Sequence, residues 1–149
     1  DNVMALNNYA YYLSEKGVDL HKAESMSYKT IKAEPNNGTY LDTYAWILFM
    51  EERYADAKTY IDQALKNRDS TADNSTVLEH AGDIYYMNGM ADESVDFWKK
   101  AYTGENQTEV LAWKIKNRQY ITEEELKKRN APKQKPAATK KSVRKGKKK

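Results

Sequence analysis

The chain has 149 residues, of which 40% are hydrophobic and 32% are charged, a composition that suits one folded domain of ordinary size. It contains no cysteine, which excludes disulfides, zinc–thiolate sites and thiol catalysis. The two histidines offer little material for a metal centre, and no run approaches the roughly 18 apolar residues that a membrane span needs.

The formal net charge of +3 averages two unlike regions. Residues 127–149 hold twelve of the 25 basic side chains and no acidic one. Residues 1–126 therefore carry 13 basic against 22 acidic side chains, a net charge of −9. An acidic body with a basic tail is expected. The chain opens at Asp1 without an initiator methionine, so we expect it to be the C-terminal piece of a longer protein.

The sequence contains an internal repeat of 34 to 37 residues. Large apolar residues recur at Leu6, Leu41 and Leu78. Five more sets follow the same order through three copies: Ala10, Ala45 and Gly82; Leu13, Leu48 and Tyr85; Ala23, Ala57 and Ser94; Ser27, Ile61 and Trp98; Thr30, Ala64 and Ala101. Chance does not keep six positions in one register, so repeated structural units are expected.

Each copy has the apolar period of two helices joined by a turn. The first helices carry Tyr9-Ala10-x-x-Leu13, Tyr44-Ala45-x-x-Leu48 and Ala81-Gly82-x-x-Tyr85. Turns are predicted at Gly17 and at Asn88-Gly89, and the copies end at Pro35, Asp69 and Gly104. The second and third copies are expected to open with capping boxes, Thr39-x-x-Asp42 and Thr76-x-x-Glu79.

The third copy, Leu78-x-x-Ala81-Gly82-x-x-Tyr85 and then Ser94-x-x-x-Trp98 and Ala101, resembles the tetratricopeptide repeat, a helix–turn–helix unit near 34 residues. The stretch from Leu41 to Ala64 matches as closely, and the first copy matches less well. The style of "LDTYAWIL" and "LEHAGDIYY" is similar to bacterial arrays of this class. The resemblance implies an all-α, right-handed α-solenoid over residues 1–104, with units at about 3–36, 37–73 and 74–104. It also implies further repeats before Asp1.

Two segments follow the three copies. Asn106-x-x-Glu109 is expected to cap a helix that runs to about Tyr120 and covers the last unit, and Thr122-x-x-Glu125 to start one more short turn. Residues 105–129 are thus predicted to form a C-terminal capping-helix region. Residues 130–149 are rich in Lys and give no buried face, so a disordered tail is predicted there.

Repeats of this class stack so that their first helices line a concave groove. The resemblance implies that the groove residues lie on those helices, opposite the packing face. The candidates are Asn7, Tyr11, Ser14, Asp42, Trp46, Phe49, Glu79, Asp83 and Tyr86. This surface would be aromatic and acidic, without lysine or arginine. Some family members grip a C-terminal carboxylate with a Lys, Asn and Arg clamp, which these carboxylates would repel, so a basic or basic–apolar peptide is the better match.

Each candidate also has a structural interpretation. Asp42 and Glu79 could complete the predicted capping boxes. Trp46 and Phe49 could pack between adjacent repeats, and Tyr11 and Tyr86 could serve packing in the same way. The groove as a whole is therefore a firmer prediction than any single member of it.

Catalysis, metal binding and cofactor binding find little support in the sequence. His80 and Asp83 are one helical turn apart, yet two or three ligands without a further histidine or a cysteine describe a solvated helix face better than a metal site. No Gly-rich phosphate loop and no set of serine, histidine and carboxylate is present. The predicted function is a non-catalytic scaffold that binds a partner segment in the groove.

The basic tail supports another class of function. Its cluster comprises Lys140, Lys141, Arg144, Lys145, Lys147, Lys148 and Lys149. Without interleaved aromatics it offers phosphate contacts but no base stacking, so the alternative is a nucleic-acid- or ribosome-associated protein that binds through residues 133–149. A solubilising end and docking on an acidic protein face, including the protein's own groove, stay open. A third alternative is assembly through Met4, Leu6 and Tyr9 of the first helix.

Overall fold

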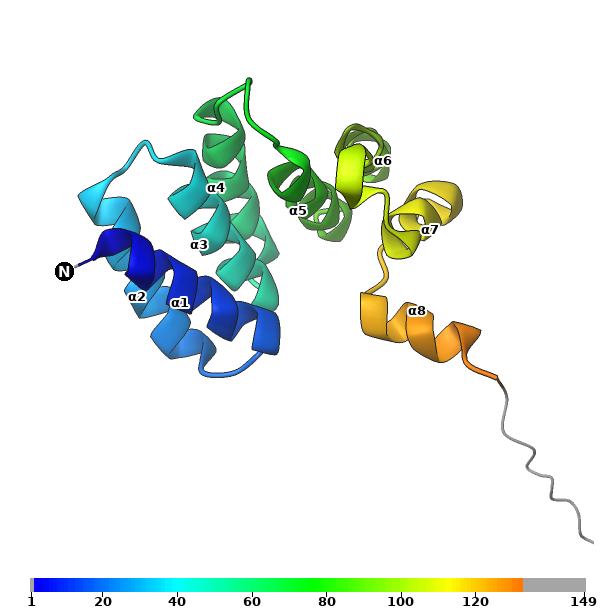
Figure 1. Cartoon of the computed structure of the whole chain (residues 1–149), viewed down its shortest axis with the longest axis horizontal. Coiled ribbons are helices and arrows are strands. Elements are labelled where there is room, and N and C mark those ends of the chain that lie inside the picture. The colour runs from blue at the N-terminus through cyan, green and yellow to red at the C-terminus, as the bar shows by residue number, and fades with distance from the viewer. Residues whose placement is uncertain (1, 133–149) are drawn as a thin grey trace, which may run out of the picture.

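The computed structural model describes residues 2–132, which fold as an all-α chain (Figure 1). The helices are α1 (Val3–Lys16), α2 (Leu20–Ala33), α3 (Gly38–Met50), α4 (Tyr54–Lys66), α5 (Ser75–Met87), α6 (Ala91–Ala101), the short 3-10 helix η1 (Gly104–Asn106), α7 (Glu109–Asn117) and α8 (Glu123–Asn130). The predicted all-α fold is confirmed. The predicted basic cluster from Lys140 to Lys149 and the predicted disorder of the tail lie beyond the described residues.

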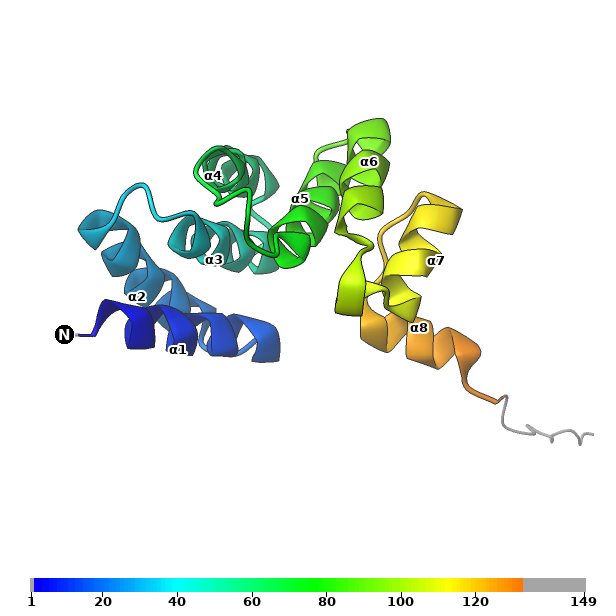
Figure 2. The ribbon, with the colours of Figure 1, turned by 45° about the horizontal axis from the view of Figure 1, so that its top comes forward.

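The helices pack as successive hairpins, α1 with α2, α3 with α4, and α5 with α6. The second helix of each hairpin contacts the first helix of the next, so α2 lies on α3, α4 on α5 and α6 on α7. The hairpins therefore follow one another in series, and α7 and α8 continue the series at its C-terminal end (Figures 1 and 2). This is the paired helix packing of a solenoid. The division of the chain into domains at residues 104 and 129 stays a prediction.

Small residues let the paired helices approach each other. Ala10, Ala45 and Ala57 are fully buried, as their repeated positions predict. In the third hairpin the contact is tighter still, because a Cβ atom at Gly82 would overlap the indole of Trp98. The repeated alternation of small and large residues therefore sets the spacing of the two helices in each hairpin.

The predicted hairpin turns at Gly17 and Gly89 are present. Both glycines have a positive φ, 68° and 79°, which only glycine adopts without strain. The middle hairpin turns through Glu52, whose φ is 62°. No glycine marks that turn in the sequence.

The predicted capping boxes of the second and third copies are wrong. Helix α3 begins at Gly38, and the side chain of Asn37 accepts the backbone N–H of Tyr40 at 3.1 Å. Helix α5 begins at Ser75, whose N–H is accepted by Asp73 Oδ1 at 2.9 Å. Because both helices begin earlier than predicted, Asp42 and Glu79 lie beyond the first turn and are not capping residues.

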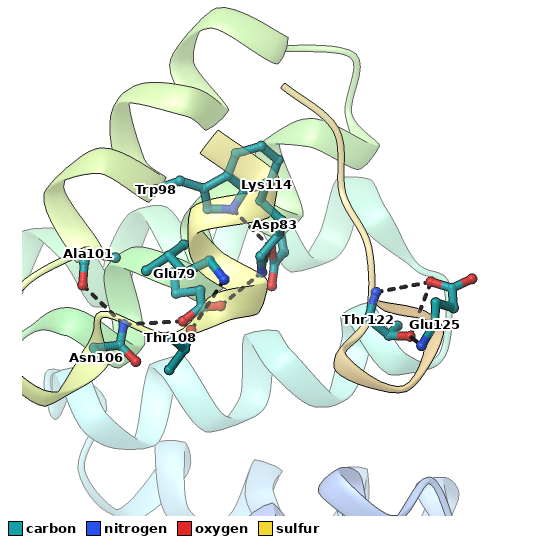
Figure 3. Close-up of polar contacts among 10 residues, drawn as sticks. Glu79, Asp83, Trp98, Ala101, Asn106, Thr108, Lys114, Thr122 and Glu125 are labelled. Atoms are coloured by element: carbon teal, nitrogen blue, oxygen red, sulfur yellow. Dashed lines mark hydrogen bonds and ion pairs between the residues drawn. The ribbon is translucent and has the colours of Figure 1, made fainter. Parts of the chain in front are cut away.

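The C-terminal helices differ from their predictions in their bounds. Thr108, rather than Asn106, caps α7, which ends at Asn117 instead of continuing to Tyr120. Thr122 and Glu125 do form a full capping box, and it starts a helix of eight residues (Figure 3). Among the described residues, no helix is long and apolar enough to cross a membrane.

Candidate functional site

Two adjoining cavities lie along the first helices of the hairpins. The first has a volume of about 600 Å³ and is lined by α1, by the N-terminal halves of α3 and α5, and by the 67–74 loop. The second, of about 400 Å³, is lined by α1, α3, α5, α7 and residues 120–123. Tyr11 and Thr76 line both. We call the surface of α1, α3 and α5 that lines these cavities the inner face.

Most of the predicted groove residues lie at these cavities. Asn7, Tyr11 and Asp42 line the first. The second is lined by Tyr11, Ser14, Trp46, Glu79 and Asp83. Phe49 and Tyr86 line neither: Phe49 is buried against Trp46, and Tyr86 packs beside Trp98. That these residues bind a peptide remains a prediction.

A lysine from α7 neutralises the C-terminal half of the inner face. Lys114 Nζ lies 2.9 Å from Glu79 Oε2 and 2.8 Å from Asp83 Oδ1 (Figure 3). Trp98 Nε1 donates a third hydrogen bond to Asp83 Oδ1, at 2.9 Å. The prediction that this surface has no lysine or arginine is therefore wrong: Lys114 of α7 lines the second cavity and Arg68 lines the first.

Burial and charge act in opposite directions on the Lys114–Asp83 pair. Burial favours the neutral form of Lys114, but the carboxylates of Asp83 and Glu79 outweigh it and raise the pKa of Lys114 above its ordinary value. Burial raises the pKa of Asp83, and Lys114 limits that rise. The pair is thus an ion pair taken out of water, which requires both partners.

Asp42 pairs with a histidine of the next hairpin. Its Oδ1 lies 2.9 Å from His80 Nδ1, and both side chains are largely buried. Burial favours neutral His80, but Asp42, and then Asp83 and Glu79, raise the pKa of His80 above its ordinary value. This contact joins α5 to α3.

One group of side chains in the described region has metal-binding spacing, and it includes neither His80 nor Asp83. It consists of His21, Glu24 and Glu51. Arg53 Nη1 already lies 2.9 Å from Glu24 Oε2 and 3.3 Å from Glu51 Oε1. A protein cation thus holds the two carboxylates together.

The aromatic residues of the inner face are stacked. The Trp46 ring lies 4.0 Å from the His80 ring and 4.6 Å from the Phe49 ring, and both pairs are nearly parallel. Tyr120, from the α7–α8 connection, meets the edge of Phe49 at 5.6 Å. Trp46 thus stacks on a ring of the next repeat, whereas the ring contacts of Phe49 are with Trp46 and Tyr54 of its own repeat and with Tyr120. Trp46 also forms part of the cavity wall.

Two buried polar atoms of the inner face have no hydrogen-bond partner among the described residues. They are Asn7 Oδ1, an acceptor, and Trp46 Nε1, a donor. Asn7 and Trp46 are 4% and 8% exposed, so both atoms are largely removed from bulk solvent. A buried polar group without a partner costs about 1–3 kcal/mol, and such groups are rare enough to require an explanation.

Negative charge remains around the second cavity after these pairings. Glu15 of α1 and Glu123 of α8 line it as exposed carboxylates. Burial, then Glu15 and Asp42, raise the pKa of Tyr11 well above its usual range, so its hydroxyl stays neutral. Sequence reasoning missed Glu15, Lys114, Tyr120 and Glu123, because their positions carry no repeat signal.

No protein-family model matches the chain. A TPR repeat-containing protein of Pseudomonas aeruginosa is 35% identical to it over 66 residues, 44% of this chain and 11% of the relative. The first TPR of Spaghetti (RPAP3) bound to the HSP90 peptide SRMEEVD has a TM-score of 0.66 at 13% identity, covering 78% of this chain and 89% of that one. The TPR2AB domain of yeast Sti1 in complex with pHSP90 has a TM-score of 0.61 at 20% identity, covering 85% and 48%.

The sequence match and the fold agree on one assignment. The chain has the fold of tetratricopeptide repeat domains and is similar in sequence to a tetratricopeptide repeat protein over 66 residues. Tetratricopeptide domains are non-catalytic binding modules, in agreement with the prediction that the chain is not an enzyme. The chain spans about a tenth of the length of its curated relative, so the relative's own activity is not transferred to it.

Proposed function

We propose that this protein is a non-catalytic scaffold that binds an extended segment of a partner protein along its inner face. Two adjoining cavities run from Asn7 to Glu123, and Tyr11 and Thr76 link them. A continuous hollow lined by one helix from each hairpin suits a chain segment better than a compact small molecule. Two solved tetratricopeptide structures with the same fold contain HSP90 or its peptide, which supports this use of the fold.

The unpaired polar atoms carry the proposal. A peptide main chain presents one N–H donor and one C=O acceptor per residue. The inner face has an unused acceptor, Asn7 Oδ1, and an unused donor, Trp46 Nε1. An extended segment that crosses α1 and α3 supplies the missing partner of each atom. Packing of the surrounding side chains does not require a polar atom at either position.

Charge favours a basic or basic–apolar partner. Seven carboxylates line the two cavities: Glu15, Asp42, Asp69, Asp73, Glu79, Asp83 and Glu123. Arg68, Lys114 and His80 compensate part of that charge and leave an excess of negative charge. The peptide SRMEEVD of the Spaghetti structure carries several carboxylates, which this surface would repel.

The test is to select, at moderate salt, the members of a library of random 12-residue peptides that bind the 149-residue chain. We expect enrichment of peptides that combine Lys or Arg with apolar residues. Asn7→Leu is expected to raise the Kd of a selected peptide about five- to ten-fold, because it removes one hydrogen bond. Its matched control is Gln107→Leu, an exposed amide away from both cavities.

Two outcomes would contradict the scaffold proposal. One is enrichment of acidic peptides, and the other is unchanged affinity in Asn7→Leu. The thermal midpoint of Asn7→Leu is measured alongside, and we expect no decrease because an unpaired buried oxygen is removed.

A second function rests on the charge of residues 133–149, which include nine basic and no acidic side chains. This is binding of nucleic acid, or association with ribosomes, through phosphate contacts. It predicts affinity that falls steeply with salt and disappears when the chain is ended at Asn130, while Asn7→Leu has no effect. Binding of a labelled single-stranded RNA at two salt concentrations separates the two functions.

A further inference from the structure

The second cavity has the composition of a site for a positively charged side chain. Its walls include the rings of Tyr11, Trp46 and Tyr120 and the exposed carboxylates of Glu15 and Glu123. In the part of the chain that the structure describes, no lysine, arginine or histidine pairs with either carboxylate. Aromatic faces together with carboxylates are the surroundings that stabilise an ammonium or guanidinium group.

The protein already holds one cation in this way at the edge of the same cavity. Lys114 Nζ lies between Glu79 and Asp83, 5.6 Å from the centre of the Trp98 ring and 5.5 Å from that of Tyr120. Lys114 thereby uses the two carboxylates of α5 (Figure 3). The charge left for a ligand is at Glu15 of α1 and Glu123 of α8, which line the same cavity.

Trp46 indicates what else the ligand carries. Trp46 is 8% exposed and lines the cavity, yet its Nε1 has no hydrogen-bond acceptor among residues 2–132. A simple cation has no acceptor to offer this donor. An amino-acid residue within a peptide has both parts, a charged side chain for the carboxylates and a main-chain carbonyl oxygen for the indole. The volume of about 400 Å³ lies near the small end of ligand sites and suits one side chain with its main chain.

We propose that this cavity binds one basic side chain, arginine or lysine, of the partner segment, with Glu15 and Glu123 as the charge-determining residues. This inference rests on the proposed peptide scaffold and specifies the residue that the scaffold selects. The side chain enters between α1 and the N-terminus of α8, and its cationic group lies between the two carboxylates. Its main-chain carbonyl accepts the N–H of Trp46.

The direct test is a titration of the 15N-labelled 149-residue chain with N-acetyl-arginine amide, followed by NMR. The chain has three tryptophans, so three indole N–H signals are expected, and Trp46→Phe identifies that of Trp46. We expect this signal to shift and to saturate at millimolar ligand. N-acetyl-citrulline amide has nearly the same shape without the charge, and we expect it to produce no shift.

Charge-removing variants locate the site. Glutamine keeps the shape of glutamate, so Glu15→Gln combined with Glu123→Gln tests the charge alone. We expect the Kd for N-acetyl-arginine amide to rise about ten-fold or more. Glu93→Gln changes an exposed carboxylate of α6 outside the cavity and is expected to leave the Kd unchanged. Equal affinity for the arginine and citrulline compounds, or no effect of the double variant, overturns the proposal.

A peptide experiment separates this inference from the scaffold proposal. Each Lys or Arg of a peptide selected on the inner face is replaced in turn by citrulline. We expect one position to lose most of its affinity in the wild-type chain and little in the Glu15→Gln/Glu123→Gln chain. A peptide that needs Asn7 but has no such position refutes the basic side-chain site and leaves the scaffold standing. Saturable arginine binding without any peptide binding supports the site and refutes the scaffold.

Discussion

The two halves of the inner face carry the same kind of residue in different surroundings. Asp42 of α3 and Glu79 of α5 occupy equivalent repeat positions, and both are carboxylates. At the C-terminal half, Glu79 and its neighbour Asp83 are held by Lys114 of α7. At the N-terminal half, Asp42 lines the larger of the two cavities, and within the described part of the chain its one charged partner is the titratable His80. A repeated position therefore does not have one role along the array: what covers it decides whether its charge serves stability or recognition.

The largest effect is expected at the C-terminal half of the inner face. Lys114→Met leaves Asp83 buried without its cation and is expected to reduce the free energy of unfolding by about 3–5 kcal/mol. Urea denaturation followed by circular dichroism measures this loss. Lys116→Met, an exposed lysine of the same helix, is the control and should change little. A loss below about 1 kcal/mol would contradict the interpretation of α7 as the element that neutralises this half.

A smaller and pH-dependent effect is expected at the N-terminal half of the inner face. Asp42→Asn removes the charge that stabilises protonated His80 and is expected to cost about 1–2 kcal/mol at pH 6. The pKa of His80 is raised in the folded chain. Its contribution to stability is therefore fully present below the unfolded value near 6.5 and is lost as the pH rises through the raised folded value.

The check on this prediction is the difference in unfolding free energy between wild type and Asp42→Asn at pH 6 and at pH 8.5. We expect the difference to shrink at the higher pH. The same pair of measurements in a His80→Gln background should show no pH dependence of the difference. A difference that does not change with pH would mean that His80 is neutral at both pH values and would contradict the prediction.

The smallest effect is expected at the wall that α8 adds to the second cavity. Thr122→Ala removes the hydrogen bond from the Glu125 N–H to Thr122 Oγ1 and should cost about 1 kcal/mol. Faster hydrogen exchange at the Leu126 amide reports the loss. Thr103→Ala is the control, because the side chain of Thr103 caps nothing at the start of η1. Equal exchange in the two variants would show that the capping box does not hold α8 in place.

The repeat pattern predicted the helices well because its signals are local. The positions of Ala10, Ala45 and Gly82 report contacts between helices adjacent in the chain, and Gly17 and Gly89 report turns whose φ only glycine adopts readily. The N-termini of α3 and α5 were predicted late, because Asn37 and Asp73 provide the first hydrogen bonds and the later Thr-x-x-Asp and Thr-x-x-Glu patterns imitate capping boxes.

Most of the predicted groove residues line the cavities, but the sequence did not predict which charges are paired there. The sequence by itself determined which helix faces repeat and which side chains, among them Asn7, Asp42 and Trp46, share the inner face, because helical periodicity places residues three and four apart on one stripe. Only the tertiary structure decided that Lys114 lies against Glu79 and Asp83, and that His80 lies against Asp42. These pairs join residues 31 to 38 positions apart, so their contact depends on how the hairpins and α7 pack, which local periodicity does not record.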